Sequence, residues 1–340
     1  MLVIAYIGFG NSVVRYHLPY VNKRLDKMKV KYIYRRQEDR DLPNEKEREK
    51  LYPSYQFTSN IEDVLNDDEV NLVVINTPHE YHVAYAKQAL DAGKNVLVEK
   101  PVALTYAQTK ELLEYANQKN LVLMPNHNRR FDTDALAVKD VLDSGKLGRI
   151  VELESHYDYF RPKMKEGVAP SMGMLLGLGI HTIDQIISFF GTPKYCVYDV
   201  RSLFYESGSD DYYDIDFFYD GMKAIMKTSV MVKTKYPRFI IHGEKGSFIK
   251  YGGKHNSDVV WKEPIHIDLE VEDESDWGIL EYENEKGETI KEKIPSKPTD
   301  YGKIYDGLYD SIHYGAAKLV SDEEVLCDMK IVEEAMEACK

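Results

Sequence analysis

The chain has 340 residues, which at roughly 150 residues per domain predicts two domains, and 43% of its residues are hydrophobic, enough for each domain to bury a core. Its 57 acidic residues exceed its 44 basic ones, giving a net charge of −13. Binding to a phosphate backbone needs a basic surface, so nucleic acid is not an expected partner. No apolar segment approaches the ~20 residues that span a bilayer, and residues 1–7 are too few for a signal peptide. We expect a soluble, cytoplasmic protein with no membrane partner.

The three cysteines, Cys196, Cys327 and Cys339, contain no CxxC pair and have no histidine at zinc-finger spacing. Neither a disulfide framework nor a structural zinc site is predicted. His79 and His82 are spaced like a metal-binding pair, but no further carboxylate or cysteine completes a ligand set, so no metal is expected. Tyrosine is unusually frequent, with 26 Tyr against 11 Phe and 2 Trp.

Strands and helices alternate over the first 125 residues. Short apolar or β-rich segments that suit the strands of a parallel sheet lie at residues 2–7, 30–34, 55–58, 72–75, 95–98 and 121–124. Helical segments are predicted at residues 13–23, from residue 60 onward, at 80–92 with Gly93 as a left-handed C-cap, and at 105–118. This alternation is typical of right-handed βαβ units and predicts an α/β Rossmann domain, a doubly wound parallel sheet, over residues 1–124.

The pattern changes after about residue 125. A helix is predicted at residues 134–144, a long strand at 150–160 and a buried, Gly- and Met-rich helix at 173–191. Further strands separated by tight turns are predicted at residues 195–203, 215–219, 224–232, 239–242 and 248–250. The last 20 residues form an amphipathic helix that begins with a capping box, Ser321 and Glu324. Residues 125–340 are therefore predicted as an α+β domain with a large, mainly antiparallel sheet.

A glycine-rich turn joins the first predicted strand to the first predicted helix. Gly8 permits the tight turn, and Gly10 allows the backbone to approach a pyrophosphate at the helix N-terminus. Val13 replaces the third glycine of the dinucleotide fingerprint. The prediction of nucleotide binding therefore rests on the position of the turn between the first strand and the first helix. The predicted nucleotide-binding residues of this turn are Gly8, Phe9, Gly10, Asn11 and Ser12.

The end of the second strand bears on the choice of cofactor. A carboxylate there would bind a ribose 2′-hydroxyl, but the chain has Tyr34, Arg35 and Arg36, with no carboxylate until Glu38. Two guanidinium groups suit a 2′-phosphate, and Tyr34 or Arg35 can stack on adenine. NADP(H) is therefore favoured over NAD(H). The alternative is that both arginines are solvated loop charges.

Two further strands end in polar residues at the edge where open α/β sheets bind ligands. Thr77, Pro78 and His79 follow one strand and are expected to cover the cofactor. Glu99-Lys100-Pro101 follows the next, and a partly desolvated lysine there can hold or exchange a proton on a substrate oxygen. Pro101 restricts Lys100 to an extended conformation and can mark a cis bond. The alternative is a surface lysine that ends a strand.

These motifs together resemble the Gfo/Idh/MocA family, the relatives of glucose–fructose oxidoreductase and inositol dehydrogenase, over nearly the whole chain. The matching segments are Gly8–Gly10, Asn76–His82, Ala92–Pro101, Gly179–Asp184 and Gly243–Phe248. A subgroup of uncharacterised bacterial oxidoreductases is still more similar, through Arg15–Pro19 and Asn128–Asp132. The resemblance implies a Rossmann domain and a C-terminal substrate-binding domain, residues 125–340, whose open sheet often forms a dimer interface. It also implies that Asn76, Glu99 and Lys100 belong to the cofactor site.

The resemblance implies hydride transfer between a nicotinamide and a hydroxyl or carbonyl of a sugar, inositol or other polyol. Lys100 and His181 correspond to the residues of proton transfer, although a lone histidine in an apolar helix is by itself more typical of a core. Asp184 corresponds to the last aspartate of the His181 motif, but Gly177 replaces its first, so either Lys100 and His181 suffice, another carboxylate substitutes, or catalysis has been lost.

The sequence therefore predicts an NADP(H)-dependent oxidoreductase that forms a homodimer or homotetramer. The alternative is a catalytically silent NAD(P)-binding sensor of the same fold. Tyrosine has an apolar face and a polar tip, which suits contact with sugar hydroxyls. The predicted substrate-binding residues are Arg129, Tyr157, Asp184 and Tyr301.

Overall fold

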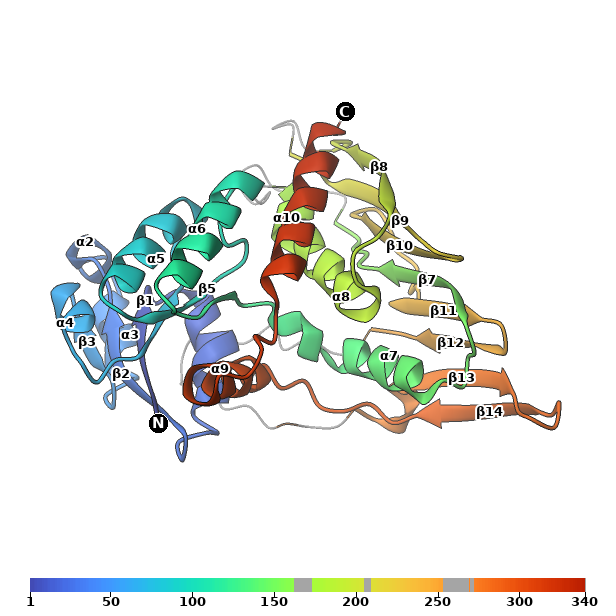
Figure 1. Cartoon of the computed structure of the whole chain (residues 1–340), viewed down its shortest axis with the longest axis horizontal. Coiled ribbons are helices and arrows are strands. Elements are labelled where there is room, and N and C mark those ends of the chain that lie inside the picture. Colours follow the sequence, from blue (N-terminus) through green and yellow to red (C-terminus); the bar gives the residue numbers. More distant parts are fainter. Residues whose placement is uncertain (162–172, 205–208, 253–268, 270–271, 340) are drawn as a thin grey trace. The chain divides into compact units, whose positions relative to one another are not determined.

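The computed structural model describes residues 1–161, 173–204, 209–252, 269 and 272–339 (Figure 1). It divides into two compact units. The first contains residues 1–128 and 300–326, and the second contains the described residues of 129–255, 269–299 and 327–340. Residues 300–326 follow the second unit's sheet in the sequence but pack in the first unit, so the units are not two consecutive halves of the chain.

The first unit is built on a parallel sheet of six strands, in the order β3-β2-β1-β4-β5-β6. Its strands are β1 (Leu2–Ile7), β2 (Met28–Tyr34), β3 (Gln56–Thr58), β4 (Leu72–Ile75), β5 (Asn95–Val98) and β6 (Leu123–Pro125). Every residue of β4 is buried, as expected for a strand covered on both faces. The order reverses between β1 and β4, so the carboxyl ends of these strands form the crevice in which Rossmann folds bind ligands. The Rossmann prediction is confirmed.

The helices of the first unit connect and cover these strands. They are η1 (Val13–His17), α1 (Leu18–Val21), α2 (Gln37–Arg40), α3 (Glu45–Lys50), α4 (Glu62–Leu65), η2 (His79–Tyr81), α5 (His82–Asp91), α6 (Tyr106–Gln118) and α9 (Gly302–Tyr314). Gly93 follows α5 with a φ of +72°, as predicted for its C-cap. The predicted helix over residues 13–23 is split into a π-helical turn, η1, and the short α1. Pro19 lacks a backbone N–H, so the helical hydrogen-bond ladder cannot run through it unchanged.

The second unit contains a sheet of eight strands, in the order β14-β13-β12-β11-β7-β10-β9-β8. Its strands are β7 (Ile150–His156), β8 (Tyr195–Arg201), β9 (Tyr212–Tyr219), β10 (Met222–Ser229), β11 (Phe239–Gly243), β12 (Gly246–Lys250), β13 (Gly278–Glu283) and β14 (Thr289–Ile294). Only the β7–β10 pair is parallel among the described pairs, so the prediction of a mainly antiparallel sheet is confirmed. The strands β13 and β14 and the helix α9 were not predicted from the sequence.

One face of this second sheet forms the core of its unit. Tyr213, Ile215 and Phe217 of β9 are fully buried on that face, while the residues between them are partly exposed on the other. The remaining helices are η3 (Asn128–Phe131), α7 (Thr133–Ser144), η4 (Leu175–Gly179), α8 (Ile180–Phe190), η5 (Glu274–Asp276) and α10 (Asp322–Glu337). The backbone N–H of Ser321 donates to Glu324, and that of Glu324 to the Ser321 hydroxyl, which confirms the predicted capping box. No helix among the described residues is long and apolar enough to cross a membrane.

Candidate cofactor and active site

The turn after β1 requires glycine at its first position. Gly8 has a φ of +101°, and a Cβ atom there would lie 2.4 Å from the backbone oxygen of Asn76, directly after β4. Backbone strain and the close approach of the two strand ends both exclude a side chain. Gly10 differs, since a Cβ there would meet nothing within 4 Å. Its backbone is accessible to a ligand from that side.

A cavity of about 290 Å³ lies at the carboxyl ends of β1, β2 and β4. The predicted cofactor residues that line it are Gly8, Phe9, Gly10, Tyr34, Arg35, Arg36, Asn76, Thr77 and Pro78. Its other lining residues, which sequence analysis did not assign to the cofactor, are Ile7, Asp39, Leu42, Glu45, Tyr81 and Tyr85. The predicted residues outside this lining are Asn11, Ser12, His79, Glu99 and Lys100. The fold thus brings segments from three strand ends to one concave surface.

The polar atoms of this cavity fit a nucleotide cofactor. The buried Oδ1 of Asn76 and Oγ1 of Thr77 have no hydrogen-bond partner among the residues that the structure describes. Buried polar atoms are seldom left without a partner, and both residues line the cavity, so these atoms fit a site for a ligand with complementary polar groups. With the accessible backbone at Gly10 and the tyrosines of the lining, these residues match the needs of NAD(P).

Arg35 is held by carboxylates within the protein. Its side chain is only 6% exposed, and its guanidinium donates to Glu45 over 2.6 Å and to Glu49 over 2.9 Å. It also lies 5.6 Å from the centre of the Phe9 ring. Two ion pairs on one buried cation fix α3 against the end of β2, so much of the hydrogen-bonding capacity of Arg35 serves the loop itself.

Arg36 is far more accessible, with 45% of its side chain exposed. Its Nε and Nη2 atoms donate to the two carboxylate oxygens of Asp39 over 2.8 and 2.9 Å. These hydrogen bonds raise the pKa of the guanidinium, which therefore stays charged. Its Cζ lies 6.0 Å from the ring centre of Tyr81. Arg36 is thus an accessible cation whose bidentate partner is the partly exposed carboxylate of Asp39, with the carboxylate of Glu38 farther away, at 3.5 Å.

The carboxylate of Glu99, directly after β5, is enclosed by donors. Its Oε1 accepts hydrogen bonds from Ser12 Oγ, from Asn126 Nδ2 over 3.1 Å and from Asn76 Nδ2 over 3.4 Å, and lies 2.8 Å from His17 Nε2. Burial alone would raise the pKa of Glu99, but the contact with His17, the donor Ser12 and the charge of Lys100 outweigh it and lower the pKa to about 2. Glu99 is therefore an enclosed carboxylate, with 17% of its side chain exposed, that is kept ionised.

Behind Glu99 the contacts continue through the core of the first unit. His17, at the end of η1, is fully buried, and its Nδ1 lies 2.6 Å from Tyr305 Oη on α9. The Tyr305 hydroxyl lies 2.9 Å from that of Tyr6 on β1. Burial raises the pKa of both tyrosines, so both hydroxyls stay protonated. His17 was not predicted to have a role, although it lies within Arg15–Pro19, one of the segments that carry the family resemblance.

Lys100 lies within electrostatic range of Glu99 and His79. Its charge lowers the pKa of the Glu99 carboxyl, and it also contributes, after burial and His82, to lowering the pKa of His79. The peptide bond between Lys100 and Pro101 is cis. His82 joins this loop to the one after β4, because its Nδ1 lies 2.8 Å from the Pro101 carbonyl and its Nε2 lies 3.0 Å from the Thr77 carbonyl.

The second unit contains His181 and three of the other predicted residues. His181 is 7% exposed near the start of α8. Asp184, one turn later, is buried and paired with Arg130, whose Nε and Nη2 donate to it over 2.6 to 3.1 Å. Arg129 donates to the hydroxyl of Tyr157 and to Asp132. Burial raises the pKa of Tyr157, which stays a protonated phenol.

Tyr301 is placed differently from the other predicted substrate residues. It precedes α9 in the first unit and is 7% exposed. Its ring packs against Tyr20, with the ring centres 5.0 Å apart, and against Tyr16, with the centres 5.8 Å apart. Part of the tyrosine excess thus lies in the core of the first unit.

Two family models match this chain. The oxidoreductase family's NAD-binding Rossmann fold matches residues 2–127, and its C-terminal alpha/beta domain matches residues 139–340. Together these models cover more than half of the sequence. The chain therefore belongs to the Gfo/Idh/MocA family of oxidoreductases, and it is an enzyme of the NAD(P)-dependent dehydrogenase and reductase class that acts on CH–OH groups.

Individual relatives agree with this family over most of their length. The chain is 46% identical to the uncharacterized oxidoreductase YhhX of Escherichia coli, over 98% of this chain and 95% of that protein. It is 31% identical to IolW of Bacillus subtilis, named scyllo-inositol 2-dehydrogenase (NADP(+)), over 99% of this chain and 93% of that protein. A solved structure of an oxidoreductase from Bacillus cereus matches with a TM-score of 0.88 and 40% identity, over 99% of this chain and 96% of that one.

Proposed function

We propose that this enzyme uses NADP(H) to transfer a hydride to or from a sugar, an inositol or another polyol. The observation that carries the proposal is the cavity at the carboxyl ends of β1, β2 and β4, where the Gly8 turn lies beside the accessible cation of Arg36. The name of IolW, an NADP-dependent inositol dehydrogenase, supports both the cofactor and the substrate class.

In this proposal Arg36 binds the 2′-phosphate of NADP(H). A phosphate would replace Asp39 as the bidentate partner of the guanidinium, which suits the planar geometry of Arg36. Arg35 supports the same loop from behind, through Glu45 and Glu49. The turn Gly8–Ser12 would bind the pyrophosphate, and the residues Asn76–His79, with Glu99 and Lys100, would surround the rest of the cofactor.

NADP(H), when bound, supplies or accepts the hydride at its nicotinamide ring. Lys100 and His181 are the proposed groups for the accompanying proton, which must join or leave the substrate oxygen. Arg129 and Tyr157 offer a guanidinium and a phenol for substrate hydroxyls. Asp184, which is ion-paired with Arg130, is also proposed to bind substrate. Tyr301 is the proposed substrate-binding residue of the first unit.

Cofactor titration and a substrate panel test this function. Purified protein is titrated with NADPH and NADH by fluorescence, and then assayed with both cofactors against inositols, aldoses and polyols. We expect tighter binding of NADPH and turnover of at least one substrate class, with a loss of at least 100-fold in Lys100→Ala. Tight NADPH binding without turnover that depends on Lys100 would contradict the proposal and favour a sensor of the same fold.

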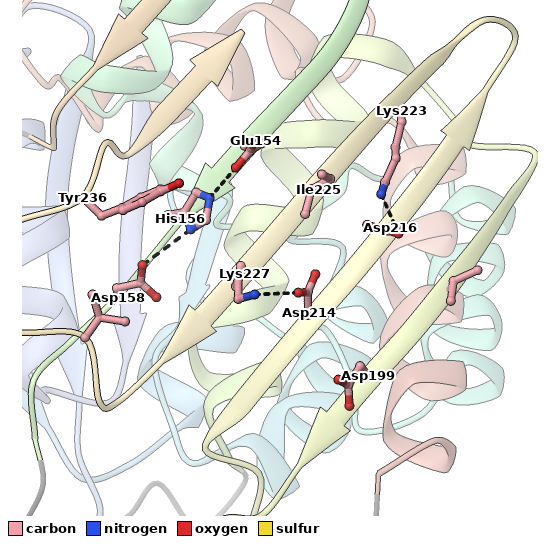
Figure 2. Close-up of a pocket in the computed structure, with 12 residues that line it drawn as sticks. Glu154, His156, Asp158, Asp199, Asp214, Asp216, Lys223, Ile225, Lys227 and Tyr236 are labelled. Atoms are coloured by element: carbon pink, nitrogen blue, oxygen red, sulfur yellow. Dashed lines mark hydrogen bonds and ion pairs between the residues drawn. The ribbon is translucent and has the colours of Figure 1, made fainter. Parts of the chain in front are cut away.

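We also propose that two copies of the chain associate through the open face of the second sheet. Apolar side chains on that face are solvent-exposed in the single chain, among them Val197 at 53% and Ile279 at 40%. A groove of about 520 Å³ lies on the same face. Figure 2 shows side chains that line it, with Lys227 paired to Asp214 and Lys223 to Asp216. A face of alternating ion pairs and apolar side chains suits a self-complementary contact.

A mutation on this face tests the association. The charge introduced by Val197→Lys is expected to shift the protein from dimer or tetramer to monomer in light scattering after size-exclusion chromatography. An exposed residue outside the sheet, Lys110 on α6, offers the control Lys110→Gln. A monomeric wild-type protein would contradict the proposal.

The three described cysteines form no disulfide, which supports our further proposal that the enzyme works in the cytoplasm.

A further inference from the structure

Gln185 of α8 holds the backbone at Arg129. Its side chain is buried, and its Nε2 donates to the backbone carbonyl of Arg129 in η3 over 2.7 Å. The preceding residue of α8, Asp184, is ion-paired with Arg130, the residue that follows Arg129. Two consecutive residues of α8 thus hold two consecutive residues of η3.

The oxygen of the Gln185 amide contacts a buried arginine. This Oε1 accepts a hydrogen bond from Nη2 of Arg238, directly before β11, over 2.8 Å. Arg238 is 6% exposed, its Nη1 donates to the Ser155 hydroxyl on β7, and its Nε lies 3.6 Å from the buried carboxylate of Asp134 on α7. Arg238 therefore joins α7, α8 and β7.

Arg238 and Arg129 both contact Tyr157, directly after β7. The guanidinium carbons of Arg238 and Arg129 lie 4.6 and 5.3 Å from the centre of the Tyr157 ring, whose electron-rich face attracts a cation. Arg129 also donates to the Tyr157 hydroxyl, and these two residues are together called the Arg–Tyr pair. Gln185 contacts both arginines and both arginines contact Tyr157, so the four residues form a closed set in which each member is held from two sides.

The members of this set differ in exposure. Gln185 and Arg238 are buried, whereas the side chain of Arg129 is 20% exposed. Desolvating a guanidinium is costly, and apolar residues of similar size often stabilise a protein as well as buried charged groups do. Packing alone therefore does not account for the polar character of Gln185 and Arg238. Orientation of the accessible Arg129 does, because a polar network fixes its members in one arrangement.

We propose that Gln185 and Arg238 are positioning residues that hold the Arg–Tyr pair in the geometry in which it binds substrate. The inference rests on the proposed substrate-binding roles of that pair and adds the residues that maintain them. Gln185 lies four positions after His181, so the two side chains leave α8 on the same face. One helix thus fixes the substrate contacts relative to His181, the residue proposed for proton transfer. Contacts that are already formed need not be ordered when substrate binds.

A double-mutant cycle tests this positioning. Gln185→Leu removes both polar contacts at similar volume, and Tyr157→Phe removes the hydroxyl of the Arg–Tyr pair. KM and kcat are measured with a substrate from the inositol, aldose and polyol panel. In each single variant we expect KM to rise about tenfold and kcat to change less than about threefold, because the lost interaction is one of binding. In the double variant we expect a rise of about tenfold rather than about 100-fold, since both changes remove the same contact.

Two further variants separate the contacts of Gln185. Gln185→Glu keeps an acceptor for Arg238 but loses the donor to the Arg129 carbonyl, so KM is expected to rise as in Gln185→Leu. Ser188→Ala is the control within α8, since the Ser188 hydroxyl donates to the backbone of its own helix and KM is expected to stay unchanged. Circular dichroism and NADPH titration check that every variant folds. If Gln185→Leu does not fold, Gln185→Glu replaces it in the cycle.

Phenylglyoxal, a reagent for arginine, tests the positioning without substrate. Peptide mass spectrometry follows the labelling of Arg129 and of Arg149, whose side chain is 58% exposed and serves as the internal reference. Arg129 must leave its hydrogen bonds to react, so in the wild type we expect it to be labelled about tenfold more slowly than Arg149. In Gln185→Leu the labelling of Arg129 is expected to accelerate about fivefold, with Arg149 unchanged and Ser188→Ala like the wild type.

The inference is overturned by KM factors that multiply in the double variant, by an unchanged KM in Gln185→Leu, or by Arg129 labelling that is as fast as that of Arg149 or insensitive to Gln185→Leu. It fails separately from the proposed function. If Tyr157→Phe keeps the wild-type KM while Gln185→Leu accelerates labelling, the pair is positioned but its assigned substrate role is wrong. If Tyr157→Phe raises KM and Gln185→Leu changes neither KM nor labelling, the substrate role stands and the positioning is wrong. If no substrate of the panel is turned over, the labelling rates decide.

Discussion

Two clusters of charge lie at the same edge of the Rossmann sheet and differ in exposure. After β2, Arg36 is 45% exposed and has Asp39 as a bidentate partner. After β5, Glu99 is enclosed by donors, and its histidine partner is fully buried. An exposed ion pair contributes little to stability, so Arg36 can exchange its partner for a ligand at low cost. The Glu99 carboxylate, which is only 17% exposed and accepts several hydrogen bonds, cannot exchange its partners at low cost.

The Gly8 turn lies between the two clusters, and its disruption is expected to have the largest effect. Gly8→Ala introduces a Cβ 2.4 Å from the Asn76 backbone oxygen at a φ of +101°. We expect a loss of about 3 kcal/mol in stability and at least 100-fold weaker NADPH binding, measured by thermal unfolding and fluorescence titration. Gly10→Ala is the control for stability, since its Cβ has open space. Equal destabilisation by the two variants would argue against the strained turn.

Single substitutions of the two arginines sharpen the contrast within the β2 cluster. Arg36→Ala is expected to weaken NADPH binding about 30-fold, the equivalent of about 2 kcal/mol, and to change NADH binding little. Arg35→Ala leaves Glu45 and Glu49 without this cation and is expected chiefly to lower the thermal midpoint. In the double variant NADPH binding should weaken far more than NADH binding. Equal losses for the two cofactors would refute the 2′-phosphate assignment.

Acid unfolding probes the β5 cluster. Folding lowers the pKa of Glu99 from 4.5 to about 2, so its contribution to stability is complete above pH 4.5 and is lost as the pH falls toward 2. Between these values the wild type is expected to lose up to about 1.4 kcal/mol per pH unit more than Glu99→Gln. Urea unfolding at several pH values measures the difference. Parallel pH profiles for the two proteins would show that Glu99 titrates normally.

The smallest expected effect comes from the counter-ion of Arg36. Asp39 occupies the guanidinium that a 2′-phosphate would need, so Asp39→Asn is expected to tighten NADPH binding about threefold while leaving NADH binding unchanged. The same fluorescence titration measures it. Glu38→Gln is a matched control, because Glu38 is farther from Arg36, at 3.5 Å, and is 69% exposed. Tighter NADH binding in Asp39→Asn would indicate a general loss of repulsion rather than release of Arg36.

Features of the fold that depend on local pattern could be predicted from the sequence. The strands at 72–75 and 95–98, the Gly93 C-cap and the Ser321 capping box are confirmed because apolar runs and capping residues act within a few positions. The sequence pattern did not predict β13 and β14, at one edge of the second sheet. The burial pattern of β14 has no fully buried residue, so its sequence lacks the apolar signal of a core strand.

The sequence by itself determined the Rossmann alternation, the glycine turn and which charged residues follow each strand. Only the tertiary structure decided what those charges meet, because partners distant in sequence are brought together by packing rather than by periodicity. Arg35 and Arg36 are adjacent in the chain, yet Arg35 is ion-paired with two carboxylates of α3, whereas Arg36 is exposed. Glu99 reaches a histidine 82 positions earlier, and that histidine reaches a tyrosine 288 positions later. No local pattern encodes such contacts, since each depends on how several loops close together.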